Sequence, residues 1–146
     1  MYKYLFYDIQ HLIMLERLKL LRAIADGGYR MIISEFRLAY YSGIMQRQLR
    51  SIIESGTMEL LDQGEGAGEF LAEYADTFAH AGNGVLLLMH LCKTENAVLI
   101  VEGEESLIAE LADFFSVPTM TLVEFYTQTI KDERYRSFLL NIKEKS

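Results

Sequence analysis

Short apolar runs alternate with longer amphipathic segments along this chain. The runs have the length and the aromatic or β-branched content that are typical of strands. They fall at residues 4–7, 31–33, 57–61, 97–101 and 117–122. The run at 97–101 consists of five consecutive apolar residues, and a strand of that kind is expected to be covered on both faces.

The segments between these runs are predicted to be helical. In residues 11–25, leucines recur every third residue from Leu12 to Leu21 with charged residues between them, which indicates one amphipathic helix. Gly27 and Gly28 are expected to end this helix. Further helices are expected over 35–53, 69–80, 84–93, 104–115, 123–132 and 134–143, the first of them with a break near 42–43.

This alternation of strands and helices indicates the fold class. Alternating elements require crossover connections, and crossovers join parallel strands. We therefore predict a three-layer α/β/α architecture with a mainly parallel central sheet, in which residues 1–146 form a single domain. The strand at 97–101 is expected at the centre of the sheet, with the strand at 4–7 beside it.

The composition narrows the class of protein. Apolar residues make up 51% of the 146 residues, which suffices for a buried core. The single cysteine, Cys92, excludes an intramolecular disulfide and a four-cysteine zinc site. The N-terminus lacks the pattern of a signal peptide, and no apolar stretch reaches the length of about 18 residues that a membrane span needs. We expect a cytoplasmic protein that does not enter a membrane.

The net charge of −7 is unevenly distributed along the chain. Residues 1–50 contain eight Lys and Arg and four Asp and Glu, whereas residues 51–130 contain one lysine, Lys93, and fourteen acids. If the more basic ends of the chain meet in space, a polyanion such as RNA has one face to approach. The overall negative charge argues against indiscriminate nucleic-acid binding.

Acidic residues follow four of the predicted strands at their carboxyl ends. Asp8 follows the first strand, Glu35 the second and Asp62 the third, and Glu102, Glu104 and Glu105 follow the fourth. The carboxyl ends of parallel strands lie at one edge of a sheet, where the functional residues of open α/β proteins gather. Carboxylates that are brought together repel one another unless a proton or a cation bridges them, and hard oxygen ligands suit Mg²⁺ or Mn²⁺.

Three blocks of the sequence together resemble a PIN-like domain. They are LFYDIQHLI, MIISEFRLAYY and AGNGVLLLMHLCKTENAVLIVEGEESLIAELADFFSVPTMTL, and in order and spacing they cover most of the chain. The resemblance implies the three-layer fold described above. It also implies metal-dependent cleavage of RNA by three or four carboxylates around one or two divalent ions, often by the toxin of a toxin–antitoxin pair.

The acid set that the resemblance implies is incomplete in this chain. Asp8 matches the family's first acid and Glu102 the fourth, with Glu104 close behind. The second position corresponds to Tyr40 and the third to Asn83, and neither is a carboxylate. The resemblance thus implies Asp8 and Glu102 as catalytic residues and adds Asn83 and Glu104 to them as metal ligands.

Two functions remain as alternatives on this basis. Loss of two carboxylates from four weakens metal binding and leaves one Mg²⁺ or Mn²⁺ ion at best, because anionic ligands hold the ion and lower the pKa of the attacking water. The favoured interpretation is a PIN-like domain with an eroded acidic site that serves as a binding or regulatory protein. The alternative is an active Mg²⁺- or Mn²⁺-dependent endoribonuclease of the toxin–antitoxin type.

The expected partners follow from the same resemblance. They are RNA, with Arg37 and Tyr40 as contact residues, and a partner protein such as an antitoxin. A homodimer is also expected, because we predict that Tyr40, Tyr41, Met45 and apolar positions near the C-terminus are exposed, and exposed apolar patches mark interfaces.

Overall fold

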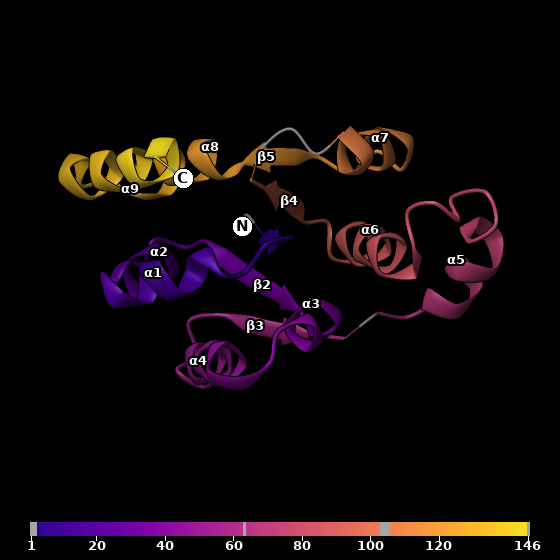
Figure 1. Cartoon of the computed structure of the whole chain (residues 1–146), viewed down its shortest axis with the longest axis horizontal. Helices are drawn as coiled ribbons and strands as arrows, with labels where there is room; N and C mark the ends of the chain where they lie inside the picture. The colour runs from indigo at the N-terminus through magenta and orange to yellow at the C-terminus, as the bar shows by residue number, and fades with distance from the viewer. Residues whose placement is uncertain (1–2, 63, 103–105, 146) are drawn as a thin grey trace.

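The structure, a computed structural model, describes residues 3–62, 64–102 and 106–145 (Figure 1). Glu104, one of the expected metal ligands, lies outside these ranges. The strands are β1 (Lys3–Phe6), β2 (Arg30–Ser34), β3 (Glu59–Leu61), β4 (Val98–Val101) and β5 (Thr119–Thr121). The helices are α1 (His11–Arg17), α2 (Leu20–Asp26), α3 (Glu35–Tyr40), α4 (Gly43–Glu54), α5 (Ala67–Tyr74), α6 (Asn83–Glu95), α7 (Ser106–Phe114), α8 (Leu122–Thr129) and α9 (Glu133–Lys145).

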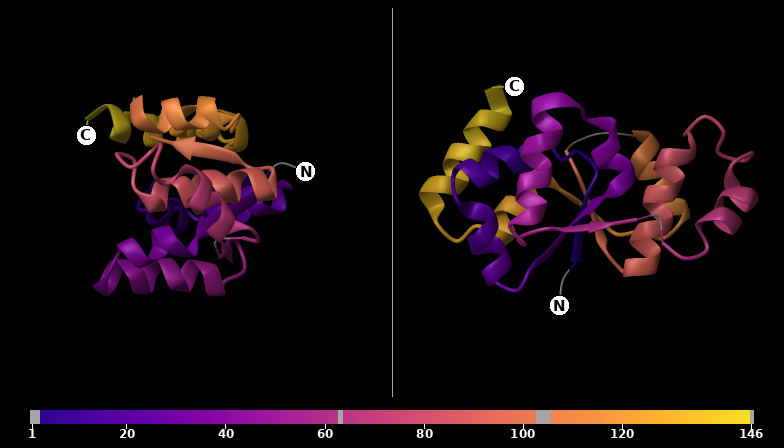
Figure 2. Two further views of the ribbon diagram at one scale, coloured as in Figure 1. Left: turned by 90° about the vertical axis from the view of Figure 1, so that its right-hand side faces the viewer. Right: turned by 90° about the horizontal axis from the view of Figure 1, so that it is seen from below.

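The strands form one parallel sheet in the order β3-β2-β1-β4-β5. Helices cover both of its faces (Figure 2), which confirms the predicted three-layer α/β/α architecture. β1 lies beside β4, as predicted, with Phe6 opposite Ile100. The middle strand is β1 rather than β4, which lies between β1 and β5. A continuous apolar run indicates a strand with neighbours on both sides, but it does not distinguish between two such strands.

Alternate residues of each strand face two separate cores, as the pleat of a strand requires. Tyr4 and Phe6 pack toward the layer that contains α1, α2, α4, α8 and α9. Leu5 and Ile32 pack toward the layer that contains α6 and α7. In the first core the fully buried Phe125 of α8 meets the rings of Tyr4 and Phe6 edge-on, with ring centroids 5.2 and 5.1 Å apart. Phe125 therefore stabilises the face of β1 that carries Tyr4 and Phe6.

The expected single helix over 11–25 is two helices, α1 and α2. Lys19 between them has a left-handed backbone (φ 62°). A continuous α-helix turns by about 100° per residue, so Leu12 and Leu21 would lie on opposite sides of it. The break at Lys19 changes the direction of the chain and lets both leucines be fully buried. The regular three-residue spacing therefore indicated a broken helix rather than a continuous one.

The expected break in the following helical region is confirmed. α3 starts after Ser34, whose hydroxyl accepts a hydrogen bond from the Phe36 N–H (3.2 Å) as a cap. It ends at Tyr40, because Tyr41 has an extended backbone, and α4 begins at Gly43. The short α3 thus brings Tyr41 back toward the carboxyl end of β1.

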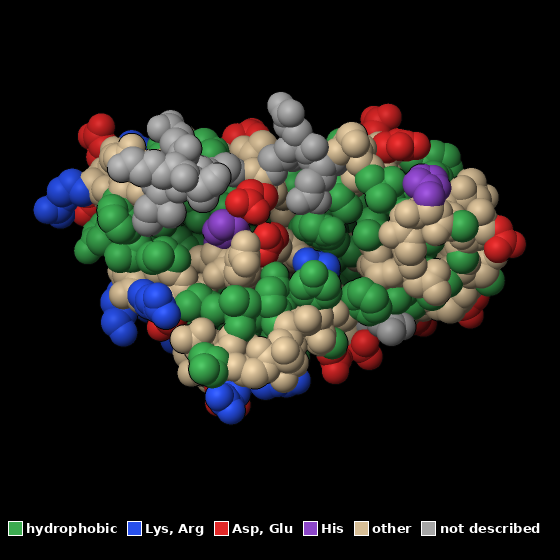
Figure 3. Space-filling view, viewed as in Figure 1, with side chains coloured by type: hydrophobic (Ala, Val, Ile, Leu, Met, Phe, Trp, Pro, Cys, Tyr) green, Lys and Arg blue, Asp and Glu red, His purple; other side chains and the backbone are tan. Residues whose placement is uncertain are grey.

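Basic side chains are unevenly distributed over the surface. Figure 3 shows most of the Lys and Arg side chains of this face over the end formed by α1, α2, α4 and α9, whereas Asp and Glu side chains occur at both ends and between them. The basic part of the charge asymmetry along the sequence is therefore also an asymmetry in space. Among the residues that the structure describes, no helix is both long and apolar enough to cross a membrane.

Candidate metal centre

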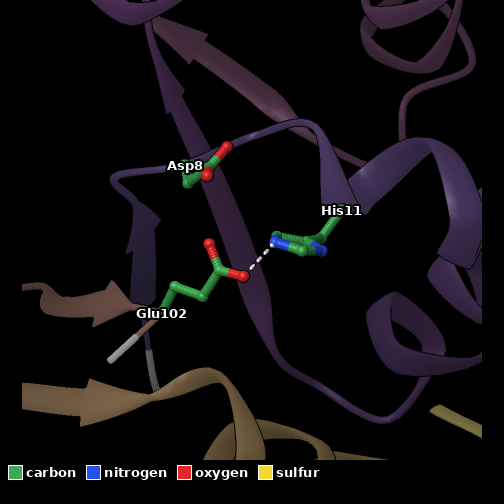
Figure 4. A group of neighbouring side chains, drawn as sticks. All are labelled: Asp8, His11 and Glu102. Carbon is green, nitrogen blue, oxygen red and sulfur yellow. Dashed lines mark ion pairs between the residues drawn. The ribbon is translucent and has the colours of Figure 1, made fainter. Parts of the chain in front are cut away.

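Asp8, His11 and Glu102 come together at the carboxyl edge of the sheet. Asp8 lies in the loop after β1, His11 is the first residue of α1, and Glu102 directly follows β4. One potential ligand atom from each lies within 4.8 Å of the others, and Figure 4 shows the three side chains pointing toward one another. The pairing of β1 with β4 brings Asp8 and Glu102 together, as the sequence predicted.

His11 lies directly against Glu102. Its Nε2 atom is 3.1 Å from Oε1 of Glu102, and the two side chains are 28% and 35% exposed. The Nε2 atom itself is shielded from solvent, and it forms no hydrogen bond of good geometry. The two atoms are at ion-pair distance when the ring is protonated (Figure 4), and a deprotonated ring presents its nitrogen to the carboxylate as a second potential ligand.

Asp8 is held by three hydrogen bonds. The Gln10 N–H donates to Oδ1 and the Gln10 side-chain amide donates to Oδ2, each at 3.3 Å. The Tyr41 hydroxyl donates to Oδ1 at 3.0 Å. A carboxylate offers about four lone-pair positions, so one position, on Oδ2, is left for an ion. These contacts fix the orientation of the carboxylate and reduce what it can offer to a metal.

Tyr41, and not Tyr40, is the tyrosine that faces the acidic cluster. Burial raises the pKa of the Tyr41 hydroxyl, with further contributions from the negative charge of Asp8 and the hydrogen bond to it. Tyr41 therefore stays neutral and donates a proton to the bond. The family's second acid would bring a negative charge and acceptor atoms to this region of the sheet edge, whereas Tyr41 brings neither.

Arg37 and Tyr40, the expected RNA contacts, lie together at the rim. The Arg37 Nε–H donates to the Tyr7 carbonyl oxygen (2.7 Å). Its guanidinium lies over the rings of Tyr7 and Tyr40, 4.4 and 5.0 Å from their centroids. Tyr40 is 74% exposed. A stacked guanidinium has a defined orientation, so the positive charge is fixed near the acids rather than free to move.

Asn83, which the resemblance implies as a metal ligand, is the first residue of α6 and is exposed. It follows Gly82, whose φ of 82° favours glycine. The ring of Phe36 lies against the neighbouring Gly84, where a Cβ atom would overlap it. Phe36 and Arg37 also line a cavity of about 140 Å³ between α3 and α6. Aromatic and cationic side chains therefore line the contact between α3 and the start of α6.

A larger cavity adjoins His11. It has a volume of about 360 Å³ and lies between α1, α4, α8 and α9. Its lining is mostly apolar with polar side chains among it, and comprises Gln10, His11, Ile13, Met14, Arg17, Met45, Gln48, Leu122, Tyr126 and Leu139. Burial raises the pKa of the Tyr126 hydroxyl, and the negative charge of Glu102 contributes to the shift. The cavity and the acidic cluster are therefore electrostatically linked.

The donor set fits one divalent ion and not two. Asp8 and Glu102 supply two negative charges, and His11 supplies a neutral nitrogen when it is deprotonated. A second ion would need further carboxylates, and the second and third positions that the resemblance implies, Tyr40 and Asn83, carry none. An ion held by Asp8, His11 and Glu102 would supply charge to polarise a phosphate and to activate a water molecule.

His11 is the member of the cluster that the sequence reasoning missed. The available signal was its position, three residues after Asp8 and at the start of a helix in the sequence DIQH. A lone histidine is a weak signal, because it is more often a packing residue than a ligand. Only the return of α1 over the end of β1 shows that this histidine faces Glu102.

The fold was compared with known proteins. No family model matches the chain, and no curated protein matches its sequence. The chain is similar to one in the crystal structure of VapBC2 from Rickettsia felis bound to a DNA fragment from their promoter. That match has 16% identity and a TM-score of 0.55, and covers 82% of this chain and 98% of that one.

A second solved structure, VapBC-1 from nontypeable Haemophilus influenzae, is similar as well. This match has 19% identity and a TM-score of 0.51, and covers 83% of this chain and 98% of that one. Identities this low carry information on the fold alone. Both matches are to PIN-domain structures, so the chain has the fold of a PIN-like domain, as its sequence resemblance implied.

Proposed function

We propose that this chain is a PIN-like protein of the toxin–antitoxin kind that works as a binding or regulatory protein, with weak or lost nuclease activity. The observation that carries the proposal is the hydrogen bond from Tyr41 to Asp8. A neutral hydroxyl, whose pKa is raised by burial, replaces a metal-binding carboxylate and also consumes an acceptor position of the carboxylate that is left.

The loss of charge has a direct chemical consequence. Hydrolysis with two metal ions stabilises both the attacking and the leaving oxygen. With Asp8 and Glu102 as the only carboxylates of the described cluster, one ion is held at most. The chain's own residues still supply part of a nucleic-acid site, because Arg37 can pair with a phosphate and the exposed Tyr40 can stack on a base. Such a site binds RNA better than it cleaves it.

The proposed protein partner is of the antitoxin type. Both structural neighbours are VapBC complexes. The lining of the cavity beside His11 includes the apolar Met14 and Met45 and the polar Arg17 and Gln48. The cavity lies at the end of the molecule where Lys and Arg side chains gather (Figure 3). It therefore suits a partner segment that carries both apolar and acidic side chains.

The test is cleavage of a single-stranded RNA by the purified chain with millimolar Mg²⁺ or Mn²⁺. The expected result is a rate equal to that of the Asp8→Asn variant, together with retained RNA binding that the Arg37→Ala variant weakens. The Asp8→Asn variant is the matched control, because it removes half of the formal charge of the cluster and would abolish metal-dependent cleavage. Cleavage that depends on Asp8 would overturn the proposal.

One observation favours the second candidate, an active Mg²⁺- or Mn²⁺-dependent endoribonuclease. Asp8 and Glu102 still meet at the strand ends, with potential ligand atoms within 4.8 Å of one another. One ion at that position can lower the pKa of a bound water. The same RNA assay decides between the candidates, and the catalytic role proposed for Asp8 and Glu102 stands only if both Asp8→Asn and Glu102→Gln abolish cleavage.

A homodimer is proposed through α3 and α4. Tyr40, Ile44 and Phe36 are 74, 67 and 45% exposed. Tyr41 and Met45, which we also expected to be exposed, are partly buried, because Tyr41 turns toward Asp8 and Met45 packs against the first core. Analytical ultracentrifugation is expected to show a dimer that the Ile44→Asp variant converts to a monomer, and a monomeric wild type at high concentration would refute it.

A further inference from the structure

The nitrogen atom in the cluster changes which ion the site prefers. We propose that Asp8, His11 and Glu102 bind a single first-row transition-metal ion, of the Zn²⁺ or Co²⁺ class, in strong preference to Mg²⁺. This inference rests on the proposed function only for the location of the site, and it holds whether or not the chain cleaves RNA.

The position of the His11 ring is the first argument. Its Nε2 atom is shielded from solvent, forms no hydrogen bond of good geometry and lies 3.1 Å from Oε1 of Glu102. A shielded polar nitrogen is costly unless a partner compensates it. A proton on Nε2 would pair with Glu102, and for the deprotonated ring an ion among the three ligand atoms, which lie within 4.8 Å of one another, would take the place of that proton.

The chemistry of the three ligands is the second argument. Mg²⁺ requires near-octahedral oxygen coordination and releases its water reluctantly, so one carboxylate oxygen from each acid and an imidazole suit it poorly. Zn²⁺ binds three protein ligands of the His and carboxylate type plus a water molecule. Imidazole strengthens binding of first-row ions toward the end of the series, in the order Mn²⁺, Co²⁺ and Zn²⁺.

The carboxylates also limit Mg²⁺ specifically. Asp8 keeps about one acceptor position after its bonds to Gln10 and Tyr41. Where a site offers few oxygen positions and one nitrogen, a strong bond to the imidazole stabilises the bound ion more than additional water ligands do. Tyr41 therefore narrows the choice of ion in addition to removing a charge.

Other potential zinc ligands among the described residues are poor competitors for the ion. Cys92 is buried, and burial raises the pKa of its thiol to about 12, so no thiolate is present at neutral pH. His90 lies at α6 with Nε2 2.7 Å from the Glu65 carbonyl oxygen, and His80 is exposed. A zinc signal can therefore be assigned by substitution of single histidines.

The test is isothermal titration of the metal-free chain with Zn²⁺, Co²⁺ and Mg²⁺ as separate probes, with visible absorption of the Co²⁺ form as a second readout. We expect one equivalent of Zn²⁺ to bind at least about tenfold more tightly than Mg²⁺. His11→Ala should weaken Zn²⁺ binding by about tenfold or more and leave Mg²⁺ binding nearly unchanged. His80→Ala is the matched control and should change neither.

His11→Asp sharpens the test, because it replaces the nitrogen by oxygen. The ratio of Zn²⁺ to Mg²⁺ affinity should then fall by about tenfold or more. Circular dichroism checks that each variant folds. Glu102→Gln takes the place of any His11 variant that does not fold, and it should also weaken Zn²⁺ binding. If His11→Ala strengthens binding of either ion, His11 competes with metal and the inference is wrong. Equal loss in His80→Ala would show adventitious surface zinc and would also refute it.

Discussion

The two halves of the candidate site differ in what they offer an ion. The strand half consists of Asp8, His11 and Glu102 and provides two carboxylates and an imidazole. The helix half, carried by α3 and the start of α6, provides the neutral hydroxyl of Tyr41, the stacked guanidinium of Arg37 and the exposed amide of Asn83. Both halves lie on the same edge of the fold, but only the strand half still has the chemistry of a metal site.

The difference shows that the backbone fold of this edge can be present without the side chains that bind metal. The backbone of the helix half is intact, because α3 is capped at Ser34 and α6 starts at Gly82 with the left-handed conformation that glycine allows. The changes are in the side chains. A carboxylate at position 41 or 83 would therefore enter a scaffold that is already formed, which makes the comparison open to experiment.

The largest expected effect comes from removing the support of the strand half. Phe125→Ala deletes a fully buried ring that packs edge-on against Tyr4 and Phe6. The free energy of unfolding should fall by about 3–5 kcal/mol, the usual cost of truncating a buried aromatic ring. Urea denaturation followed by circular dichroism measures this loss.

A surface ring on α9 is the control for that substitution. Phe138 is 48% exposed, and Phe138→Ala should cost less than about 1 kcal/mol. If the two variants lose equal stability, the strand half does not depend on the aromatic packing below β1. The proposed dependence of the strand half on the buried ring of Phe125 would then be wrong.

The second effect comes from restoring an acid to the helix half. Tyr41→Glu removes the hydrogen bond to Asp8 and places a negative charge next to it. At about pH 8, without metal, the variant should lose about 1–3 kcal/mol of stability, because a bond to a charged group is lost and two carboxylates repel. Millimolar Mg²⁺ should restore much of this loss, as measured by thermal unfolding, because the ion would bridge the two acids.

The neighbouring tyrosine supplies the matched control. Tyr40 is 74% exposed, and Tyr40→Glu should change stability by no more than about 0.5 kcal/mol with or without Mg²⁺. A similar Mg²⁺ response from both variants would mean that Tyr41 does not occupy a metal-binding position. It would also remove the observation on which the proposed function rests.

Much of the fold was predictable from the sequence, because the three inner strands, β1, β2 and β4, are largely buried and form clear apolar runs. The parallel sheet, the proximity of β1 to β4 and the break between α3 and α4 all followed from apolar runs and glycine positions. The break at Lys19 was not predicted, because the leucine spacing conflicts with one continuous helix but a left-handed lysine gives no local signal of where the helix is broken.

The candidate site was predictable only where backbone pairing determines it. The meeting of Asp8 and Glu102 follows from strand adjacency. The roles of His11 and Tyr41 depend on how α1 and α3 return over the sheet edge, and this is a property of tertiary packing. The sequence register places the family's second acid at Tyr40, and it gives no indication that the neighbouring Tyr41 contacts Asp8.

The smallest expected effect concerns position 83, where the comparison between the halves is most easily sharpened. Asn83 is exposed in the first turn of the 13-residue helix α6, so Asn83→Asp places a negative charge near the positive end of the helix dipole. The variant should gain about 0.3–1 kcal/mol of stability without any metal, while its Mg²⁺ affinity should rise by no more than about threefold, because position 83 is exposed and an exposed carboxylate contributes little to holding an ion. Thermal unfolding and Mg²⁺ titration of this variant, alone and combined with Tyr41→Glu, measure the stability and the Mg²⁺ affinity.

Additive effects on Mg²⁺ affinity are expected if the two positions act separately. A large gain in Mg²⁺ affinity from Asn83→Asp alone would mean that α6 contributes to the ion site directly, and that the helix half lacks only this one carboxylate.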